Sequence, residues 1–495
     1  MIQKLLVTLL FLNASVIIQA QQVSSKILDE ETKEPIPYAS IQFSKTDGVM
    51  SNEEGMFEFP KPKNITSKDS LKITSLGYRA ESFSLQDTIP EIIFLKQEVF
   101  EIDPVILSNK KLSVDEIIDN VKNNLDNNYQ TKYIAGKAFI RETYKQRIKK
   151  FNFDVEKSSI DNINQTLFDT IVGKFPKNFT SLVESYGDVY SYNNKKSKTN
   201  LQKVLLIQSK HEISSIKKIQ EDFFKTLRDN TKPNSYLVIK SGIIRLDKTE
   251  TIDSILGEEE KRKAKPIQTK NKDIQKYRDI LVNRLFENLF INEEASVDIL
   301  NKSNKYEFHK TGFIEIGDDL AYIIEFNSKG KAKYKGKLFI NTEDFAVIRA
   351  DIQGAHKIFD KHFNMLGISA NDLSYNSTII FTKNKDNKYS LKYLKISDSQ
   401  QVGIDRPIKI IEKNKFVKGR RKQNQISFQM NIQIMNYSTK EIVFTDSEFL
   451  PKSMFEAFKP KSDFQIKRLD SYDSSFWNGY KIITPEKAIK ELKIE

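Results

Sequence analysis

The sequence predicts a mainly β protein with inserted helices, in which a small β-sandwich precedes a large antiparallel sheet, curved or rolled into an unclosed barrel and packed on helices. Three observations support this fold class. Short alternating segments separated by turn residues fill residues 36–78. Long alternating segments fill the second half of the chain, and a few stretches between them have helical spacing of apolar residues. Together these patterns exclude an all-helical or a doubly wound α/β protein.

The sandwich is predicted from residues 36–78. Ala39, Ile41 and Phe43 alternate with polar residues, which is the period of a half-buried strand. Residues 52–55 (Asn-Glu-Glu-Gly) are typical of a tight polar turn, and residues 56–59 return as a strand. Turns this close together leave no room for helices, which indicates a small antiparallel β-sandwich.

A set of residues in this region also carries a family pattern. They are Val23, Asp29, Thr32, 35–39 (Pro-Ile-Pro-Tyr-Ala), Gly48, 51–57 and the pair Gly77-Tyr78. The run resembles the carboxypeptidase-regulatory-like (transthyretin-like) domain, although Ser24 and Ser25 stand where the family has an early Gly. Domains of this family follow the catalytic domain of some metallocarboxypeptidases and precede the plug of many TonB-dependent outer-membrane receptors. The resemblance implies a sandwich without catalytic residues, in an exported protein of a Gram-negative bacterium of the Bacteroidetes type.

The first 20 residues have the features of a secretory signal. Lys4 supplies the positive start, residues 5–12 the apolar stretch, and Ala20 a small residue at the cleavage position. We expect cleavage after Ala20, with an uncleaved anchor as the alternative, and a location in the periplasm or on the periplasmic face of the outer membrane. No later segment reaches about 18 consecutive apolar residues, so we expect no membrane span in the mature chain. The chain has no Cys and therefore no disulfides.

The remaining sequence divides into segments of different character. We expect a signal peptide, the sandwich, a helical linker, a large β domain and a tail with a short helix, over residues 1–20, 21–107, 108–130, 131–450 and 451–495. The linker helix begins at Ser113, which forms a capping box with Glu116. Two further helices are predicted within the β domain, over residues 216–227 and 274–289.

The strands of the large domain are predicted from period-two alternation. They cover residues 306–316, 320–327, 334–341, 345–353, 377–383, 389–397, 408–413 and 426–437. The segment 334–350 resembles a hairpin of outer-membrane lipoprotein carriers, which fold as an unclosed barrel over helices with an apolar cavity for acyl chains. A plain large β-sandwich, or a curved sheet without a cavity, fits the same alternation.

Charge and motifs exclude several functions. The formal net charge is +13, from 79 Lys and Arg against 66 Asp and Glu, and it is densest at residues 415–422 and 261–272. Neither stretch lies in a recognisable nucleic-acid module or is interleaved with aromatic residues, so we expect no nucleic-acid binding; solvated loops explain the charge, and loops facing anionic lipid are the alternative.

Signs of catalysis are equally sparse. The chain has four His, and the nearest pair, His356 and His362, lacks the spacing of a zinc site. There is no Cys nucleophile, no Gly-x-Ser-x-Gly and no phosphate-binding loop. A pair of glycosidase carboxylates far apart in the chain leaves no local motif. We therefore expect a protein that is not an enzyme and that has no metal and no cofactor.

These observations favour a non-enzymatic envelope protein with a binding or scaffolding role, whose partner is an acyl chain, another amphipathic molecule or an outer-membrane protein. The candidate ligand contacts, which we expect to be core residues first, are Leu338, Ile340, Ile348, Ile352, Phe428, Met430 and Ile432. The alternative is a carbohydrate-binding or TonB-receptor-associated accessory protein, which predicts that Phe57, Phe59 and Tyr78 face the solvent. A metallocarboxypeptidase-like enzyme is the least favoured reading.

Overall fold

The computed structural model describes residues 22–44, 48–62, 65–66, 69–100, 112–129, 133–192, 196–232, 234–242, 244–246, 271–316, 319–354, 363–384, 386–419, 421–461 and 463–494. Two compact units contain them. The sandwich unit comprises Met1–Val99, Ile314–Asp318 and Asp473–Lys490, and the large-sheet unit comprises Phe100–Phe313, Asp319–Tyr472 and Glu491–Glu495. The mainly β class, with a small N-terminal sandwich and a large unclosed sheet, is confirmed. The predicted signal peptide lies outside the described residues.

Two small sheets form the sandwich unit. Their strands are β1 (Gln22–Asp29), β2 (Ser40–Gln42), β3 (Gly48–Met50), β4 (Met56–Pro60), β5 (Ser70–Ser75), β6 (Tyr78–Ser84) and β7 (Ile92–Leu95). The strand orders are β4-β1-β7 and β3-β2-β5-β6, with β1 antiparallel to β4 and parallel to β7. The short helices η3 (Ser474–Trp477) and α9 (Lys487–Lys490) belong to the same unit.

The predicted alternation places the core of this unit correctly. Ala39, Ile41 and Phe43 are buried, as expected. Phe57 and Phe59, however, are 0% and 1% exposed, and Phe59 stacks on Phe43 with ring centroids 4.4 Å apart. The prediction of a solvent-facing aromatic platform is therefore wrong, because both rings of β4 point into the core that alternation assigns to every second residue.

Tyr78 and Asp29 form the main polar contact within the sandwich. The Tyr78 hydroxyl donates to Asp29 Oδ2 at 2.9 Å, and the backbone N–H groups of Glu31 and Thr32 donate to Asp29 Oδ1 at 2.8 Å each. Asp29 is 1% exposed, so these donors replace the water that its carboxylate would otherwise bind. Tyr78 is only partly buried and is engaged by this contact rather than free to stack on a ligand.

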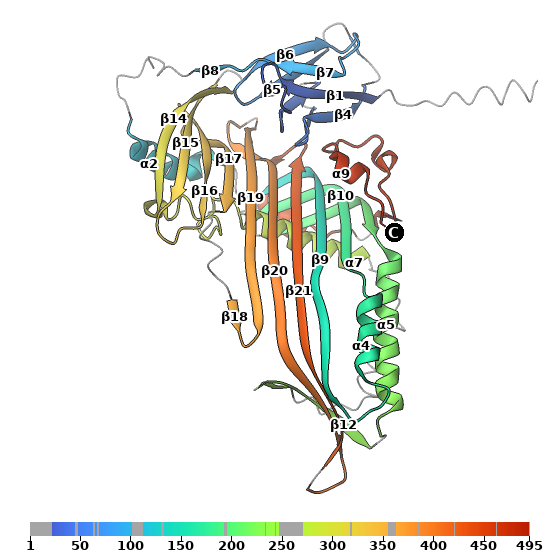
Figure 1. Cartoon of the computed structure of the whole chain (residues 1–495). Coiled ribbons are helices and arrows are strands. Elements are labelled where there is room, and N and C mark those ends of the chain that lie inside the picture. The colour runs from blue at the N-terminus through green and yellow to red at the C-terminus, as the bar shows by residue number, and fades with distance from the viewer. Residues whose placement is uncertain are drawn as a thin grey trace, which may run out of the picture. The chain divides into compact units, whose positions relative to one another are not determined.

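A large sheet dominates the second unit (Figure 1). Its strands are β9 (Ile134–Ser158), β10 (Asn178–Tyr192), β11 (Lys196–Gln208), β12 (Ser235–Ser241), β13 (Ile244–Leu246), β14 (Tyr306–Ile316), β15 (Asp319–Ser328), β16 (Tyr334–Asn341), β17 (Val347–Gly354), β18 (Phe363–Met365), β19 (Ile368–Lys383), β20 (Tyr389–Asn414), β21 (Lys422–Phe444), β22 (Glu448–Phe449) and β23 (Gln465–Leu469). The main path runs β23-β11-β10-β9-β21-β20-β19-β17-β16-β15-β14-β8, and its last strand, β8, is the two-residue segment Val99–Phe100. Within the described residues the two end strands, β23 and β8, do not pair with each other, so this sheet is unclosed.

The longest strands differ from the sequence prediction. Residues 389–397 and 408–413 were expected to be separate strands, but β20 runs unbroken from Tyr389 to Asn414. Gly403 and Pro407 lie in its middle, and both residues normally weaken a strand. Pairing with β21 continues through both positions, Gly403 opposite Gln433 and Pro407 opposite Gln429. The long neighbouring strand therefore overrides the local preference of these two residues.

Helices of the large-sheet unit are α2 (Val114–Asn123), α3 (Leu125–Asn128), α4 (Gln165–Lys174), α5 (Lys210–Asp229), α7 (Asn271–Phe286) and α8 (Lys452–Ala457), with the short η1 (Ser303–Lys305). The capping box at Ser113 is confirmed: its side chain accepts from the Glu116 N–H, and Glu116 accepts from the Ser113 N–H. The helices predicted at 216–227 and 274–289 are confirmed as α5 and α7, whereas α4 was not predicted. Among the described helices, none has the length and apolar character required to cross a bilayer.

Candidate functional site

One face of the large sheet carries its helices and is called the helix face. Residues directly opposite each other on neighbouring strands point to the same face. Glu142 on β9 lies opposite Lys440 on β21, Lys440 opposite Ile396 on β20, and Ile396 opposite Ser377 on β19. The hydroxyl of Tyr277 on α7 donates to the two Glu142 carboxylate oxygens at 2.7 and 2.8 Å, which places α7 on this face.

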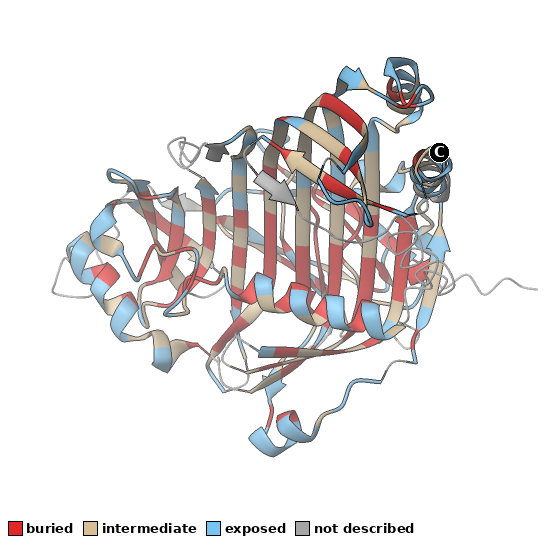
Figure 2. Ribbon diagram, turned by 90° about the horizontal axis from the view of Figure 1, so that it is seen from below, coloured by how far each residue is buried: buried red, intermediate tan, exposed pale blue. Residues whose placement is uncertain are grey.

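Helix α7 crosses the strands rather than running along them. At its start Ile274 packs against Val204 on β11, and at its end Phe286 stacks on Phe444 of β21 with ring centroids 6.4 Å apart. Seven residues of α7 are buried, and Figure 2 shows buried residues on the strands of the sheet as well. This end of the helix face is therefore hydrophobic core.

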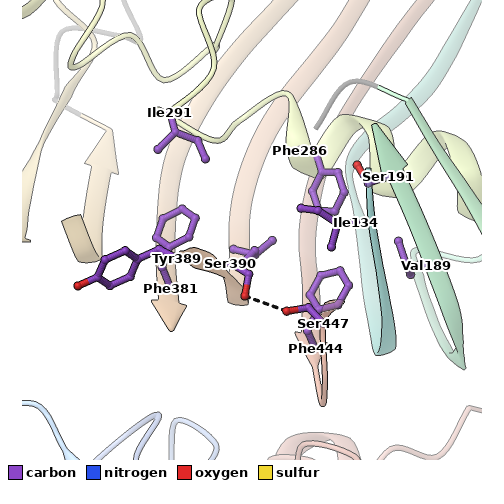
Figure 3. A pocket seen from close by; sticks show the side chains of 11 residues that line it. Ile134, Val189, Ser191, Phe286, Ile291, Phe381, Tyr389, Ser390, Phe444 and Ser447 are labelled. Carbon is purple, nitrogen blue, oxygen red and sulfur yellow. Dashed lines mark hydrogen bonds between the residues drawn. The ribbon is translucent and has the colours of Figure 1, made fainter. Parts of the chain in front are cut away.

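A small apolar cavity lies beneath the C-terminal end of α7 (Figure 3). It is lined by Ile134, Val189, Ser191, Phe286, Ile291, Phe381, Tyr389, Ser390, Leu391, Phe444 and Ser447. The Ser390 and Ser447 hydroxyls form a hydrogen bond of 2.8 Å at its wall. Its volume is about 20 Å³, which is room for a single water molecule and far too little for an acyl chain.

Helices α4 and α5 cover the opposite end of the helix face. Phe428 on β21 packs against Phe168 on α4 with ring centroids 4.8 Å apart, and Phe153 on β9 lies 5.8 Å from Phe428. Leu227 of α5 and Leu237 of β12 complete the same cluster. The long strands thus have core at both ends of one face, beneath two different sets of helices (Figure 1).

Between these two covered ends the helix face carries apolar residues that are only partly buried. We call them the apolar strip: Ile148 and Phe151 on β9, Ile432 and Ile434 on β21, Val402 and Ile404 on β20, and Ala370 and Ile368 on β19. The strand pairing sets them in two adjacent rows across four strands, a width of about 14 Å for three strand spacings. Ile368 is 38% exposed and the other seven are intermediate.

A polar pocket borders the strip on the side of α7. Its volume is about 510 Å³, and it is lined by Arg284, Leu285, Glu287, Asn288, Lys333, Tyr334, Asp372, Ser374, Tyr375, Ile396, Asp398, Ser399, Gln400 and Lys440. Lys440 Nζ lies 3.3 Å from Asp398 Oδ1. Burial raises the pKa of Tyr334 to about 12 and raises that of Tyr375 further, so both phenols are neutral at physiological pH. The pocket therefore offers hydrogen bonds and charges of both signs.

The opposite face of the sheet contains a buried ionic cluster. Arg141 on β9 lies between Glu184 on β10 and Glu441 on β21, with N···O distances of 2.6 and 3.0 Å. Tyr393 and Tyr472 donate their hydroxyls to Glu441 and Glu184. Burial lowers the pKa of Arg141, but the two carboxylates outweigh it and raise that pKa above its ordinary value. Every charge in the cluster has a partner and little access to solvent, so the cluster stabilises strand pairing rather than binding a ligand.

Six of the seven predicted ligand contacts lie on the helix face, in two separate regions, and the seventh, Ile348, is the extra residue of a β-bulge in β17. The pairing Leu338–Ala350–Ile379–Leu394–Ile442 connects β16 to β21 on one face. Leu338, Ile340, Ile348 and Ile352 are at most 9% exposed and belong to the core. Phe428 is buried in the α4–α5 cluster, Met430 packs against it, and Ile432 lies in the apolar strip.

Sequence reasoning missed most of the strip. The predicted strands did not extend over Ile148, Phe151, Val402 and Ile404. The sequence therefore did not assign these residues to either face of the sheet. Ile434 lies in the predicted strand 426–437, and its alternation with Gln433 was the available signal. No local sequence pattern shows which rows of sheet residues the helices leave uncovered.

No cluster of three or more metal-ligating side chains occurs among the described residues. His309, on β14, is exposed, with its Nε2 3.6 Å from Glu307. His356 and His362 lie outside the described residues, and the side chain of His211 is not described.

Comparison with protein families identifies the first unit. Residues 23–107 match the model of the CarboxypepD_reg-like domain, so the sandwich belongs to the class that residues 23–78 resemble. The match covers the sandwich and not the large sheet. No curated protein matches the chain.

Solved structures show only distant likeness. A putative outer membrane lipoprotein-sorting protein domain from Vibrio parahaemolyticus is 9% identical, covers 69% of this chain and 97% of its own, and has a TM-score of 0.21. A DUF1329 family protein from Desulfovibrio piger is 9% identical, with 70% and 97% coverage and a TM-score of 0.18. The Pseudomonas aeruginosa MucA/MucB complex is 5% identical, with 65% and 93% coverage and a TM-score of 0.17. The first belongs to the class that the 334–350 hairpin resembles, but at these scores the likeness does not bear on function.

Proposed function

We propose that this protein is a non-enzymatic component of a Gram-negative envelope, exported to the periplasm or the periplasmic face of the outer membrane, that binds an amphipathic ligand on the helix face of its large sheet. The observation that carries the proposal is the apolar strip. Apolar residues from four adjacent strands stay partly exposed there, between two ends that helices cover.

The physical reason is the free energy of burying apolar surface. An acyl chain that shields 200 Å² of the strip would gain about 5 kcal/mol, at about 25 cal/mol per Å². Pockets that border the strip offer polar groups for the polar part of such a molecule, and the polar pocket on the α7 side is one of them. The cavity beneath α7 holds no more than a water molecule, so the proposed ligand lies on the sheet surface rather than in an enclosed cavity.

The sandwich supports the location and a protein partner. Residues 23–107 match a domain type whose relatives, by the resemblance given above, precede the plug of outer-membrane receptors. We therefore propose an outer-membrane protein as the partner of the sandwich unit, with the scaffolding role independent of the ligand role.

The ligand role is tested with the full mature chain and a fluorescent undecanoic acid, together with native mass spectrometry of protein purified from its own envelope. Ile434→Asn places an amide in the strip, and we expect it to weaken probe binding at least tenfold. The matched control is Gln433→Asn, which changes the next residue of the same strand on the opposite face, and should leave binding unchanged. Equal affinity of the two variants, or no probe binding by the native chain, would overturn the ligand role.

A further inference from the structure

A second pocket opens beside the strip, at the corner between β9 and α4. It forms where α4 ends at Lys174 and β10 begins at Asn178, and the Ile148 N–H donates to the Lys177 carbonyl oxygen at 2.8 Å. Its volume is about 210 Å³. Its apolar lining residues are Ile148, Phe151, Val172, Phe175 and Pro176, and Phe151 and Phe175 pack with ring centroids 4.4 Å apart. We call it the corner pocket.

Lysines form the rim of the corner pocket. Lys149, Lys150 and Lys177 line it and are exposed, and no carboxylate is among its lining residues. None of the three has an ion-pair partner among the described residues. The register shifts here, with Ile148 opposite Ile434 and Lys150 opposite Gln433, so Lys149 is the extra residue of a β-bulge. Bulges re-aim side chains at the edges of sheets, and this one concentrates positive charge at the pocket.

The corner pocket and the apolar strip share residues. Ile148 and Phe151 belong to both, and they lie opposite Ile434 and Ile432. An apolar chain lying along the strip therefore reaches Lys149 and Lys177 without crossing a polar row, whereas Lys150, opposite Gln433, starts from the other face of the sheet. Surface lysines alone are ordinary, but lysines around an apolar floor complement a molecule that has an apolar chain and a negative head.

The polar pocket on the α7 side carries charges of both signs. Asp398 there is already paired with Lys440, and Asp372 accepts from Gln400 at 3.0 Å. Glu287 adds a further carboxylate. Arg284 and Lys333 also line that pocket, so three cations stand beside three carboxylates there, whereas the charged residues that line the corner pocket are all lysines.

From these contrasts we infer that the ligand is an anionic amphiphile, a single acyl chain with a carboxylate or phosphate head, and that Lys149 and Lys177 bind that head. The inference rests on the proposed ligand role and adds the sign of the head group and its place. Chain contacts come from the apolar strip, and head contacts come from the corner pocket.

The test uses the full mature chain and four probes with the same twelve-carbon chain: laurate, dodecyl phosphate, dodecyl maltoside and dodecyltrimethylammonium. Isothermal titration below their critical micelle concentrations, at low and high salt, gives each dissociation constant. We expect the two anions to bind at least tenfold tighter than the cation, with the preference shrinking at high salt because the lysines are exposed. Comparing the dissociation constants of laurate and dodecyl phosphate then distinguishes a carboxylate from a phosphate head.

Charge reversal locates the head group. The double variant Lys149→Glu, Lys177→Glu should abolish or invert the preference for anions while dodecyl maltoside binding stays within twofold. The control double variant Lys415→Glu, Lys418→Glu makes the same change in net charge at two exposed residues far along the chain and should keep the preference.

Three results would overturn the inference. Equal binding of all four probes, unaffected by the Lys149→Glu, Lys177→Glu variant, would leave the proposed ligand role standing without a charged head. Binding only to vesicles of anionic phospholipid, with no binding of the monomeric probes, would identify a membrane surface as the partner. No binding of any probe would remove the proposed ligand role itself.

Discussion

Phe428 and Ile434 lie on the same strand and point to the same face, yet their surroundings differ. Phe428 is 6% exposed and packs against aromatic residues of α4 and β9. Ile434, six residues further along β21, remains partly exposed in the apolar strip. The alternation of β21 makes both residues face the same side, and only the position of the helices separates them. An apolar face of a sheet is thus a core where a helix covers it and a candidate binding surface where none does.

The largest difference should appear when each residue is truncated. Phe428→Ala removes a ring from a packed cluster and should lower the free energy of unfolding by about 3–5 kcal/mol. Ile434→Ala removes a side chain that solvent already reaches, so we expect a loss below about 1 kcal/mol. Urea unfolding of the full chain measures both, and equal losses would show that the strip is packed core.

The ionic cluster on the opposite face offers a second comparison of covered and open positions. Arg141→Met leaves Glu184 and Glu441 buried without their cation, which should cost about 3–5 kcal/mol. Arg147→Met, at an exposed position of the same strand, should change the free energy of unfolding by no more than about 0.5 kcal/mol. A loss below 1 kcal/mol for Arg141→Met would mean that the two carboxylates find other partners.

The sandwich predicts a smaller and pH-dependent effect. Burial and the neighbouring Asp29 raise the pKa of Tyr78 to about 12, against about 10 in an unfolded chain. Because the folded pKa is the higher one, the stabilisation from neutral Tyr78 is fully present below pH 10 and is lost between pH 10 and pH 12. Tyr78→Phe should cost about 1–2 kcal/mol at pH 8 and make the decline above pH 10 shallower.

Hydrogen exchange of the β1 amides, followed from pH 8 to the alkaline range, reports on the sandwich separately from the large sheet. Tyr38→Phe is a control, because Tyr38 donates its hydroxyl to the exposed Glu53 rather than to a buried carboxylate. An identical alkaline profile in the native chain and the Tyr78→Phe variant would contradict the assignment to Tyr78.

A polar substitution in the apolar strip should have the smallest effect on stability and the largest effect on ligand binding. Val402→Asn should change the melting temperature little, because the residue is only partly buried, yet weaken probe binding at least tenfold. Leu338→Asn, on the same face but fully buried, should unfold or strongly destabilise the large-sheet unit. A melting temperature that falls equally in both variants would erase the distinction between strip and core.

Local sequence patterns predicted the elements better than the site. The alternation from Ile426 to Ile434 predicted a strand and its apolar face, and the pair Ser113 and Glu116 predicted the start of a helix. Both features depend only on residues that are close together in the sequence. The break expected around Gly403 and Pro407 was wrong, because pairing with β21 outweighs local preference there. The uncovered part of the face depends on where Phe168 of α4 packs against Phe428, about 260 residues along the chain, and no local pattern contains that contact.

Photochemical labelling tests the central claim most directly. A twelve-carbon fatty acid with a photoreactive group at the end of its chain is bound to the full mature chain, irradiated, and located by peptide mass spectrometry. The account predicts labels on the β20 and β21 segments around Val402 and Ile434, suppressed by excess laurate and lost in the Ile434→Asn variant. Labels on the opposite face, around Gln401 and Gln433, or labels that laurate does not suppress, would contradict it.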